Sequence, residues 1–196
     1  MVRSPLSVTI QIPSGKQSGE MRDGLVELIV DAVKAGASIG FLAAVSRDEA
    51  IEYWERVFAE VEFDRRLLIV AKNGELVLGA IQLSLAQLPN GRHRGEVEKL
   101  LVHTSARRRG LGTALLMAAE DAALARGRHL LLLDTRAGDP AGKLYEKLGY
   151  IRAGVIPGYA LSPSGHLHSS AIYYRDLRDC DPQVLGENDA PTRDFP

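Results

Sequence analysis

A strand, a glycine-containing turn, a helix and a second strand follow one another in mid-sequence, and this unit constrains the fold most. Glu96–His103 ("EVEKLLVH") alternates at first and then becomes fully apolar, which is typical of a strand. A helical pattern follows the turn and extends to about Arg126. The dense apolar run His129–Thr135 ("HLLLLDT") then predicts a strand that is buried on both faces. Together these segments predict a β–α–β crossover.

The rest of the chain predicts a mixed α/β domain whose first half is antiparallel, in the order β-α-α-β-β-β-α-β-α-β-β. The other expected elements are a strand at Leu6–Ile12, a polar loop at Gly15–Gly19, helices at Asp23–Lys34 and about Arg47–Glu60, a hairpin with its turn at Asn73–Gly74, a turn at Pro89–Gly91, a short helix within Asp139–Tyr150, and two strands separated by a long loop at Pro157–His168.

Composition excludes several classes of protein. The 196 residues are 45% apolar and carry a net charge of −1, so no general attraction to nucleic acid or to an anionic membrane is expected. The single cysteine, Cys180, excludes an internal disulfide and a cysteine-based zinc site. No apolar run approaches the roughly 18 residues of a membrane helix, and no signal peptide is evident. We expect a cytoplasmic protein, a monomer or homodimer, with one domain over residues 5–178 and a polar, flexible tail over 179–196.

The turn between the first strand and the helix has the composition of an anion-binding site. Arg107–Thr113 ("RRRGLGT") opens a helix, where free backbone N–H groups and the helix dipole favour negative charge. Gly110 and Gly112 leave those N–H groups accessible, and arginines add forked donors. The arrangement fits a pyrophosphate, although it is neither the nucleotide-triphosphatase loop nor G-x-G-x-x-G. The alternative is a basic helix start that lies in solvent.

Two motifs resemble those of the GNAT family of N-acetyltransferases. Arg107-x-x-Gly110-x-Gly112 is similar to the family's pyrophosphate-binding motif, and Leu144–Tyr150 ("LYEKLGY") is similar to the end of its second motif. The resemblance implies a GNAT fold, with about seven strands in a mixed sheet and about four flanking helices. It also implies acetyl-CoA as cosubstrate and no metal. The implied coenzyme-binding residues are Leu101, Val102, His103, Arg107, Arg108, Arg109, Gly110, Leu111, Gly112 and Thr113.

One residue departs from the family pattern. Many members carry an asparagine near the start of the second motif's helix, and Gly138 stands there, followed by Asp139. Segments 95–112, 130–138 and 154–174 are further similar to family members that inactivate a β-lactam-containing amino acid toxin by acetylation. The implied activity is acetyl transfer to the amine of a small molecule.

Three residues are candidates for the chemistry. Glu96 precedes the glycine-containing loop on its strand and is the candidate base, but Glu98 shares its face, so alternation alone does not choose between them. The resemblance favours Glu96. Asp134 ends a strand where ligand sites of α/β sheets gather, although it is equally compatible with a loop or cap carboxylate. Tyr145 is the candidate acid for the departing sulfur, and its alternative is a core tyrosine.

The resemblance also implies an acceptor site. Its candidate residues are Ser38, Phe41, Gln82, Tyr159 and His168. His166 and His168 have no evident third ligand, so we expect a polar rim there rather than a metal site. Two other functions stay open: a peptide or protein N-acetyltransferase, which would have an open groove, and a CoA-binding sensor without catalysis.

Overall fold

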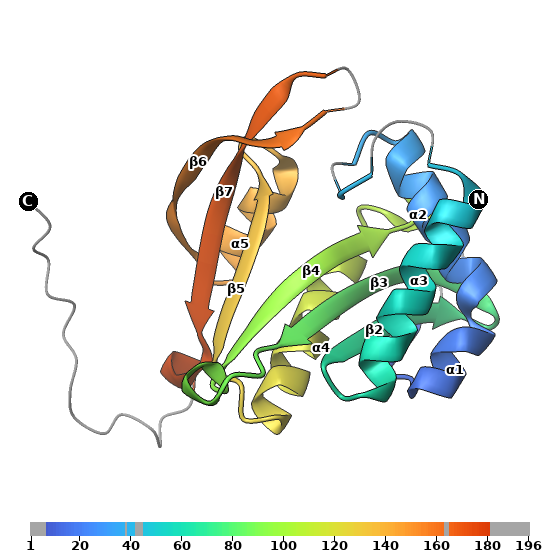
Figure 1. The fold of residues 1–196 in the computed structure, drawn as a ribbon, viewed down its shortest axis with the longest axis horizontal. Coiled ribbons are helices and arrows are strands. Elements are labelled where there is room, and N and C mark those ends of the chain that lie inside the picture. Colours follow the sequence, from blue (N-terminus) through green and yellow to red (C-terminus); the bar gives the residue numbers. More distant parts are fainter. Residues whose placement is uncertain (1–6, 38, 42–44, 163–164, 181–196) are drawn as a thin grey trace, which may run out of the picture.

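The computed structural model describes residues 7–37, 39–41, 45–162 and 165–180. These residues form a mixed seven-stranded sheet in the order β1-β2-β3-β4-β5-β7-β6 (Figure 1). The strands are β1 (Thr9–Gln11), β2 (Arg66–Asn73), β3 (Leu76–Leu85), β4 (Arg94–Val102), β5 (Leu130–Arg136), β6 (Ile151–Leu161) and β7 (Leu167–Asp176). Only β4 and β5 pair in parallel; the other neighbours are antiparallel. The predicted β–α–β crossover and the antiparallel first half are therefore confirmed.

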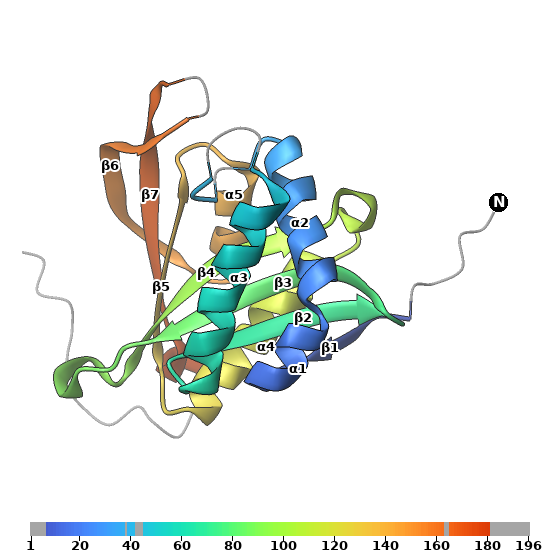
Figure 2. The ribbon, with the colours of Figure 1, turned by 45° about the vertical axis from the view of Figure 1, so that its right-hand side comes forward.

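Five helices flank the sheet in the described part of the chain. They are α1 (Gly15–Glu20), α2 (Arg22–Lys34), α3 (Arg47–Glu62), α4 (Leu111–Ala125) and α5 (Pro140–Lys147). Figures 1 and 2 show α1, α2 and α3 on one face of the sheet, over β2 and β3, and α4 and α5 on the other. We call the first the α2/α3 face and the second the α4 face.

Alternate residues of the strands pack into two hydrophobic cores, one on each face of the sheet. Leu68 and Val70 of β2 pack with Leu25 and Trp54 of α2 and α3. Ile69, between them in sequence, points the other way and packs among the residues of α4. The central strands are thus buried on both faces, which explains the continuous apolar runs in β2 and β3.

β5 differs from this pattern. Leu131 and Leu133 are buried under α4, whereas Leu130 and Leu132 on the α2/α3 face are only half-buried. The prediction that this strand is buried on both faces is wrong, because α2 and α3 cover β2 and β3 but not β5 (Figure 1). A partly open sheet surface remains on that side.

Residues 15–19 form a helix and not the predicted polar loop. The Ser14 hydroxyl accepts from the backbone N–H of Gln17, and the Gln17 side chain accepts from the backbone N–H of Ser14. This reciprocal capping box offsets the poor helix propensity of a glycine-rich segment. The Ser-x-x-Gln spacing was the signal for it.

Two further boundaries differ from the expectations. The predicted long loop at Pro157–His168 is largely strand, since β6 continues to Leu161 and β7 begins at Leu167. Pro157 and Gly158 fall where the β6–β7 register is irregular, on an edge strand whose outer N–H groups need no partner. The predicted first strand is also shorter, Thr9–Gln11.

Some expectations concern residues outside those described. Leu6 of the predicted first strand and the predicted tail beyond residue 180 belong to this group. None of the helices in the described ranges has both the length and the apolar character to cross a membrane.

Candidate active site

The parallel strands β4 and β5 separate beyond their first residues. Their pairing covers only Arg94–Glu96 with Leu130–Leu132, although β4 continues to Val102 and β5 to Arg136. A bulge adds to the divergence, because Lys99 has φ of 49° and the β3–β4 register shifts between Ala80 and Gln82. The edge of β4 that faces β5 therefore offers backbone groups beyond Glu96 to an extended ligand. Leu101 and Val102 lie on this stretch of β4.

The loop that follows β4 is shaped for an anion at the start of α4. Arg108 and Gly110 have φ of 62° and 80°, and Gly110 caps α4 in the left-handed conformation. Arg107, Arg108 and Arg109 are exposed. Arg107 Nε also donates to the carbonyl of Val102 at 3.0 Å, which fixes the loop against the end of β4.

The glycines of the loop leave its backbone accessible. A Cβ at Gly110 would meet nothing within 4 Å, and one at Gly112 would come no nearer than 3.5 Å, to Leu144 of α5. Thr113 is half-buried, whereas Leu111 is buried in the core of the α4 face, so it offers a ligand only its backbone. The loop and its free N–H groups fit a pyrophosphate.

Helix α2 supports this loop. The carboxylate of Asp31 accepts hydrogen bonds from the backbone N–H and the hydroxyl of Thr104, at 2.8 and 2.7 Å. His103 Nε2 lies 3.7 Å from the same carboxylate, and its Nδ1 is 2.8 Å from the Ser105 hydroxyl. His103 therefore contacts both Asp31 of α2 and Ser105 of the loop, and helps to hold the loop in place. The sequence analysis missed Asp31, because 73 residues separate it from Thr104.

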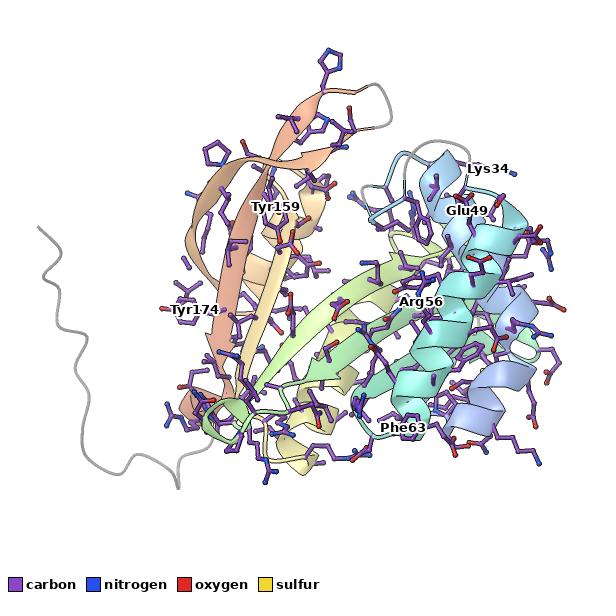
Figure 3. All side chains as sticks on the ribbon, viewed as in Figure 1. Lys34, Glu49, Arg56, Phe63, Tyr159 and Tyr174 are labelled. Carbon is purple, nitrogen blue, oxygen red and sulfur yellow. The ribbon has the colours of Figure 1, made fainter. Side chains whose placement is uncertain are left out.

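Glu96, Asp134 and Tyr145 line one cavity of about 350 Å³, which we call the Tyr145 cavity. They come from β4, β5 and α5. Tyr159 and His168 of the β6–β7 hairpin line it too, as does Ser170. The three residues proposed for chemistry are therefore brought together from three separate elements. Figure 3 shows Tyr159 on the hairpin beside the region where β4 and β5 diverge.

The environments of Glu96 and Glu98 differ, although both lie on the α2/α3 face of β4. Glu98 accepts from the Ser84 hydroxyl at 2.5 Å and pairs with the Arg66 guanidinium at 3.1 Å. Burial alone would raise the Glu98 pKa, but these two partners outweigh it and lower the pKa. Glu98 is thus ionised at neutral pH and already bonded to Ser84 and Arg66.

Glu96 has the opposite tendency. Burial, followed by the negative charges of Glu98 and Asp134, raises the pKa of Glu96, while Arg66 and Lys99 oppose the shift. Glu96 is exposed to the cavity and makes no hydrogen bond to any residue that the structure describes. A carboxylate with a raised pKa and open access to a cavity suits proton transfer.

Asp134 is held by its neighbour strand. The Ser170 hydroxyl of β7 lies 2.5 Å from Asp134 Oδ2 and 2.9 Å from the carbonyl oxygen of Thr135. A single hydroxyl hydrogen cannot be fully donated to both, and the shorter contact is the one to the charged acceptor. Ser170 therefore orients a second carboxylate toward the cavity, and the sequence analysis had not singled it out.

Tyr145 is the most deeply buried of the three candidate residues. Only 6% of its surface is exposed, and its ring packs against Tyr150 and Tyr173 at centroid distances of 5.9 Å. Burial, and then the charges of Asp139 and Asp134, raise the pKa of the phenol above its ordinary value of 10. Tyr145 is therefore both a core tyrosine and a protonated hydrogen-bond donor at neutral pH.

The two residues that depart from the family pattern form the turn and the cap at the start of α5. Gly138 has φ of 86°, and the Asp139 carboxylate caps α5 by accepting from the backbone N–H of Ala141 at 2.8 Å. A glycine adopts this left-handed conformation without steric cost. Asp139 also lines the Tyr145 cavity, where it adds to the negative charge around Tyr145.

The structure separates the candidate acceptor residues into different environments. Tyr159 and His168 line the Tyr145 cavity. Phe41 packs edge-on against Tyr53 of α3 at 5.4 Å, and neighbouring Gly40 and Ile39 line the cavity. Ser38 lies outside the described residues.

Gln82 does not reach the cavity. It is fully buried, its amide oxygen accepts from Arg66 at 2.6 Å, and its amide nitrogen donates to the Tyr53 hydroxyl at 2.8 Å. Gln82 is therefore not brought together with Tyr159 and His168, because Tyr53 of α3 covers it. Gln82 supports Arg66, the partner of Glu98.

Known proteins are similar to this chain in sequence. Residues 28–150 match the model of the acetyltransferase (GNAT) family. An uncharacterised N-acetyltransferase from the hisH–hisA intergenic region of Azospirillum brasilense is 31% identical over 131 residues, which are 66% of this chain and 76% of that protein.

Solved structures share the fold. An N-acetyltransferase of Staphylococcus aureus has a TM-score of 0.72 at 21% identity, over 87% of this chain and 99% of that one. The Salmonella typhimurium protein yncA, solved with its cofactor acetyl-CoA, has a TM-score of 0.70 at 20% identity, over 95% and 99% of the two chains. With its GNAT fold and its match to the family model, this chain belongs to the GNAT family and is an N-acetyltransferase.

Proposed function

We propose that this enzyme transfers the acetyl group of acetyl-CoA directly to the amine of a small molecule, with Glu96 as base and Tyr145 as the donor to the departing sulfur. The observation that carries the proposal is the convergence of Glu96, Asp134 and Tyr145 on one cavity at the divergence of β4 and β5. Acetyl-CoA supplies the activated acetyl group as a thioester.

The loop at the start of α4 is the proposed seat of the coenzyme's pyrophosphate. Its left-handed residues, Arg108 and Gly110, turn the chain so that free N–H groups of the first helical turn stay accessible. The exposed arginines add charge-assisted donors. The open edge of β4 around Leu101 and Val102 would bind the extended arm by backbone hydrogen bonds, as a neighbouring strand does.

Proton movement follows from the charges around the cavity. An amine has an ordinary pKa of about 10, so it reaches the site as an ammonium ion, which Glu96 and Asp134 attract. Glu96 takes a proton from it, directly or through water. The raised pKa of Glu96 reduces the difference between the pKa values of the ammonium ion and the carboxyl group, and so lowers the free-energy cost of this transfer. The amine nitrogen then bonds to the acetyl carbon as the carbon–sulfur bond breaks.

Tyr145 acts on the leaving group. Its raised pKa keeps the phenol protonated, so it hydrogen-bonds the sulfur as negative charge develops there. A proton passed to the sulfur leaves a phenolate, which regains a proton from the amine or solvent. Glu96 then releases to solvent the proton that it took. The whole reaction therefore yields an acetamide, a thiol and one proton, with no net change at Glu96 or Tyr145.

The test is an acetylation screen by mass spectrometry. Acetyl-CoA would be offered with amino acids, polyamines, aminoglycosides and short peptides. The panel would include β-lactam amino acids, because the segments noted above resemble the tabtoxin resistance protein. We expect a small amine to gain 42 mass units, the mass of an acetyl group replacing hydrogen, and Glu96→Gln to lose about 10² to 10⁴ in rate.

A matched variant makes the screen specific. Glu75→Gln changes the same side chain at a fully exposed position beside the β2–β3 turn, and it should leave the rate unchanged. Acetylation of peptides but of no small amine would contradict the proposed acceptor class. Binding of acetyl-CoA without transfer to any amine would favour a sensor over an enzyme acting on these acceptors.

A further inference from the structure

A second cavity adjoins the proposed active site on the α2/α3 face of the sheet. It has a volume of about 370 Å³, and we call it the Arg94 cavity. Glu96, Asp134 and Tyr159 line both this cavity and the Tyr145 cavity. An acceptor bound to the two carboxylates therefore has room to extend into the Arg94 cavity. On this face, none of the helices that the structure describes covers β5, so the surface is partly open.

Arg94 is the cation of this cavity. It precedes Glu96 by two residues on β4, so the two side chains leave the same face of the sheet. Arg94 is exposed and forms no ion pair with any side chain that the structure describes. Its guanidinium is thus available to pair with an anionic group of a ligand.

The Arg94 guanidinium lies toward the turn that precedes β4. Its Nη2 is 3.4 Å from the position that a Cβ would take on Gly91, which ends the short helix Pro89–Gly91. This places the charge on the side of Arg94 away from Glu96. The cations that act on the Glu96 pKa are Arg66 and Lys99.

The Arg94 cavity also has apolar side chains in its lining. Leu132 and Ile172 supply apolar side chains to the lining, Leu132 beside Glu96 and Ile172 beside Asp134 in the strand register. A complementary ligand has an amine, a short apolar chain and an anionic group. Arginine is well suited to the anion, because its planar fork matches a carboxylate.

We infer that Arg94 binds a carboxylate of the acceptor that is separated from the reacting amine by several bonds. Residues two apart on a strand are about 7 Å apart. An α-amino acid holds its amine and carboxylate only two bonds apart and cannot span this distance through its α groups. The acceptor class is thus an ω-amino acid or a compound with the same spacing. The inference rests on the proposed function for the position of the amine.

The test is a binding titration in the presence of CoA. Three ligands with the same number of carbons are compared: δ-aminovalerate, pentylamine and norvaline. They carry a distant carboxylate, no carboxylate and an adjacent carboxylate, respectively. Each is titrated by calorimetry against the native enzyme, Arg94→Gln and Arg92→Gln. Arg92 is an exposed arginine that lines neither cavity, so it controls for the loss of one positive charge.

We expect δ-aminovalerate to bind about tenfold to a hundredfold more tightly than pentylamine, which is the range for a hydrogen bond between charged groups. Arg94→Gln should abolish this preference, while Arg92→Gln keeps it. Equal binding of the three ligands, or equal loss in both variants, would overturn the inference. Acetylation is measured separately, with acetyl-CoA in place of CoA. Selective binding through Arg94 without acetyl transfer would contradict the proposed function but not the binding site at Arg94.

Discussion

Replacement of Arg66 by methionine should destabilise the protein through one defined network. Arg66 begins β2, and only 12% of its side chain is exposed. Its guanidinium bonds to Glu60 of α3, to Gln82 of β3 at 2.6 Å and to Glu98 of β4 at 3.1 Å. Arg66 therefore ties a helix to three strands next to the candidate base. Methionine keeps the apolar stem and removes the charge.

The magnitude follows from the exposure of each partner. Glu60 is 47% exposed, so its ion pair contributes about 0–1 kcal/mol. Glu98 is 26% exposed, and a hydrogen bond to a charged group is worth about 1.5–3 kcal/mol. Gln82 retains its bond to Tyr53, which limits its loss. We expect a free energy of unfolding lower by about 3 kcal/mol and a Tm lower by about 6–12 °C.

The loss should depend on pH. The Glu98 pKa is lower in the folded protein than its ordinary value of 4.5, so the stabilisation from its ionised form is present above that value. It disappears as the pH falls through the folded pKa, because protonation removes the charge that Arg66 pairs with. The difference between the native protein and Arg66→Met is therefore full at pH 7 and shrinks below about pH 4.5.

Urea denaturation at pH 7 and pH 4 measures both effects. Arg56→Met is the matched control, since Arg56 is exposed on α3 (Figure 3), and it should change stability by no more than about 0.5 kcal/mol. A loss for Arg66→Met no larger than that of the control would refute the network. A large loss that is equal at both pH values would refute the role of ionised Glu98.

The other predictions concern the site. Tyr145→Phe should lower kcat about 10²-fold or more, while a binding titration shows unchanged affinity for acetyl-CoA. The control Tyr174→Phe should leave kcat unchanged. Equal kcat values in the two variants would show that Tyr145 takes no part in the chemistry. Gly110→Ala should lose about 1–2 kcal/mol through its left-handed conformation, seen as a lower Tm and weaker acetyl-CoA binding, and an unchanged Tm would contradict the strain. Glu98→Gln should lower the pKa of Glu96, because a neighbouring negative charge is removed. A carbon NMR titration of the carboxyl groups measures this pKa. A Glu96 pKa that rises or stays the same would contradict the electrostatic coupling between Glu96 and Glu98.

The local patterns of the sequence predicted much of the fold. The β–α–β unit, the Asn73–Gly74 hairpin and the loop at Arg107–Gly112 depend on residues close in sequence, and the structure contains all three. The family resemblance added Tyr145 as a candidate, and the structure places it on the same cavity as Glu96.

The features that could not be predicted from the sequence depend on contacts between residues far apart in the chain. Alternation placed Glu96 and Glu98 on one face, but only the arrival of Arg66 from β2 and Ser84 from β3 distinguishes them. The burial of Gln82 follows from the packing of α3 over β3, which no local pattern encodes. These distinctions arise from tertiary structure and not from propensity.

The central claim is that Glu96, and not its neighbour Glu98, removes the proton. The most direct measurement is the single-turnover rate of acetyl transfer, at pH 7 and with saturating acetyl-CoA, for the native enzyme, Glu96→Gln and Glu98→Gln. The account predicts a rate about 10² to 10⁴ lower for Glu96→Gln and a far smaller change for Glu98→Gln. An unchanged rate in Glu96→Gln, or a greater loss in Glu98→Gln, would contradict it.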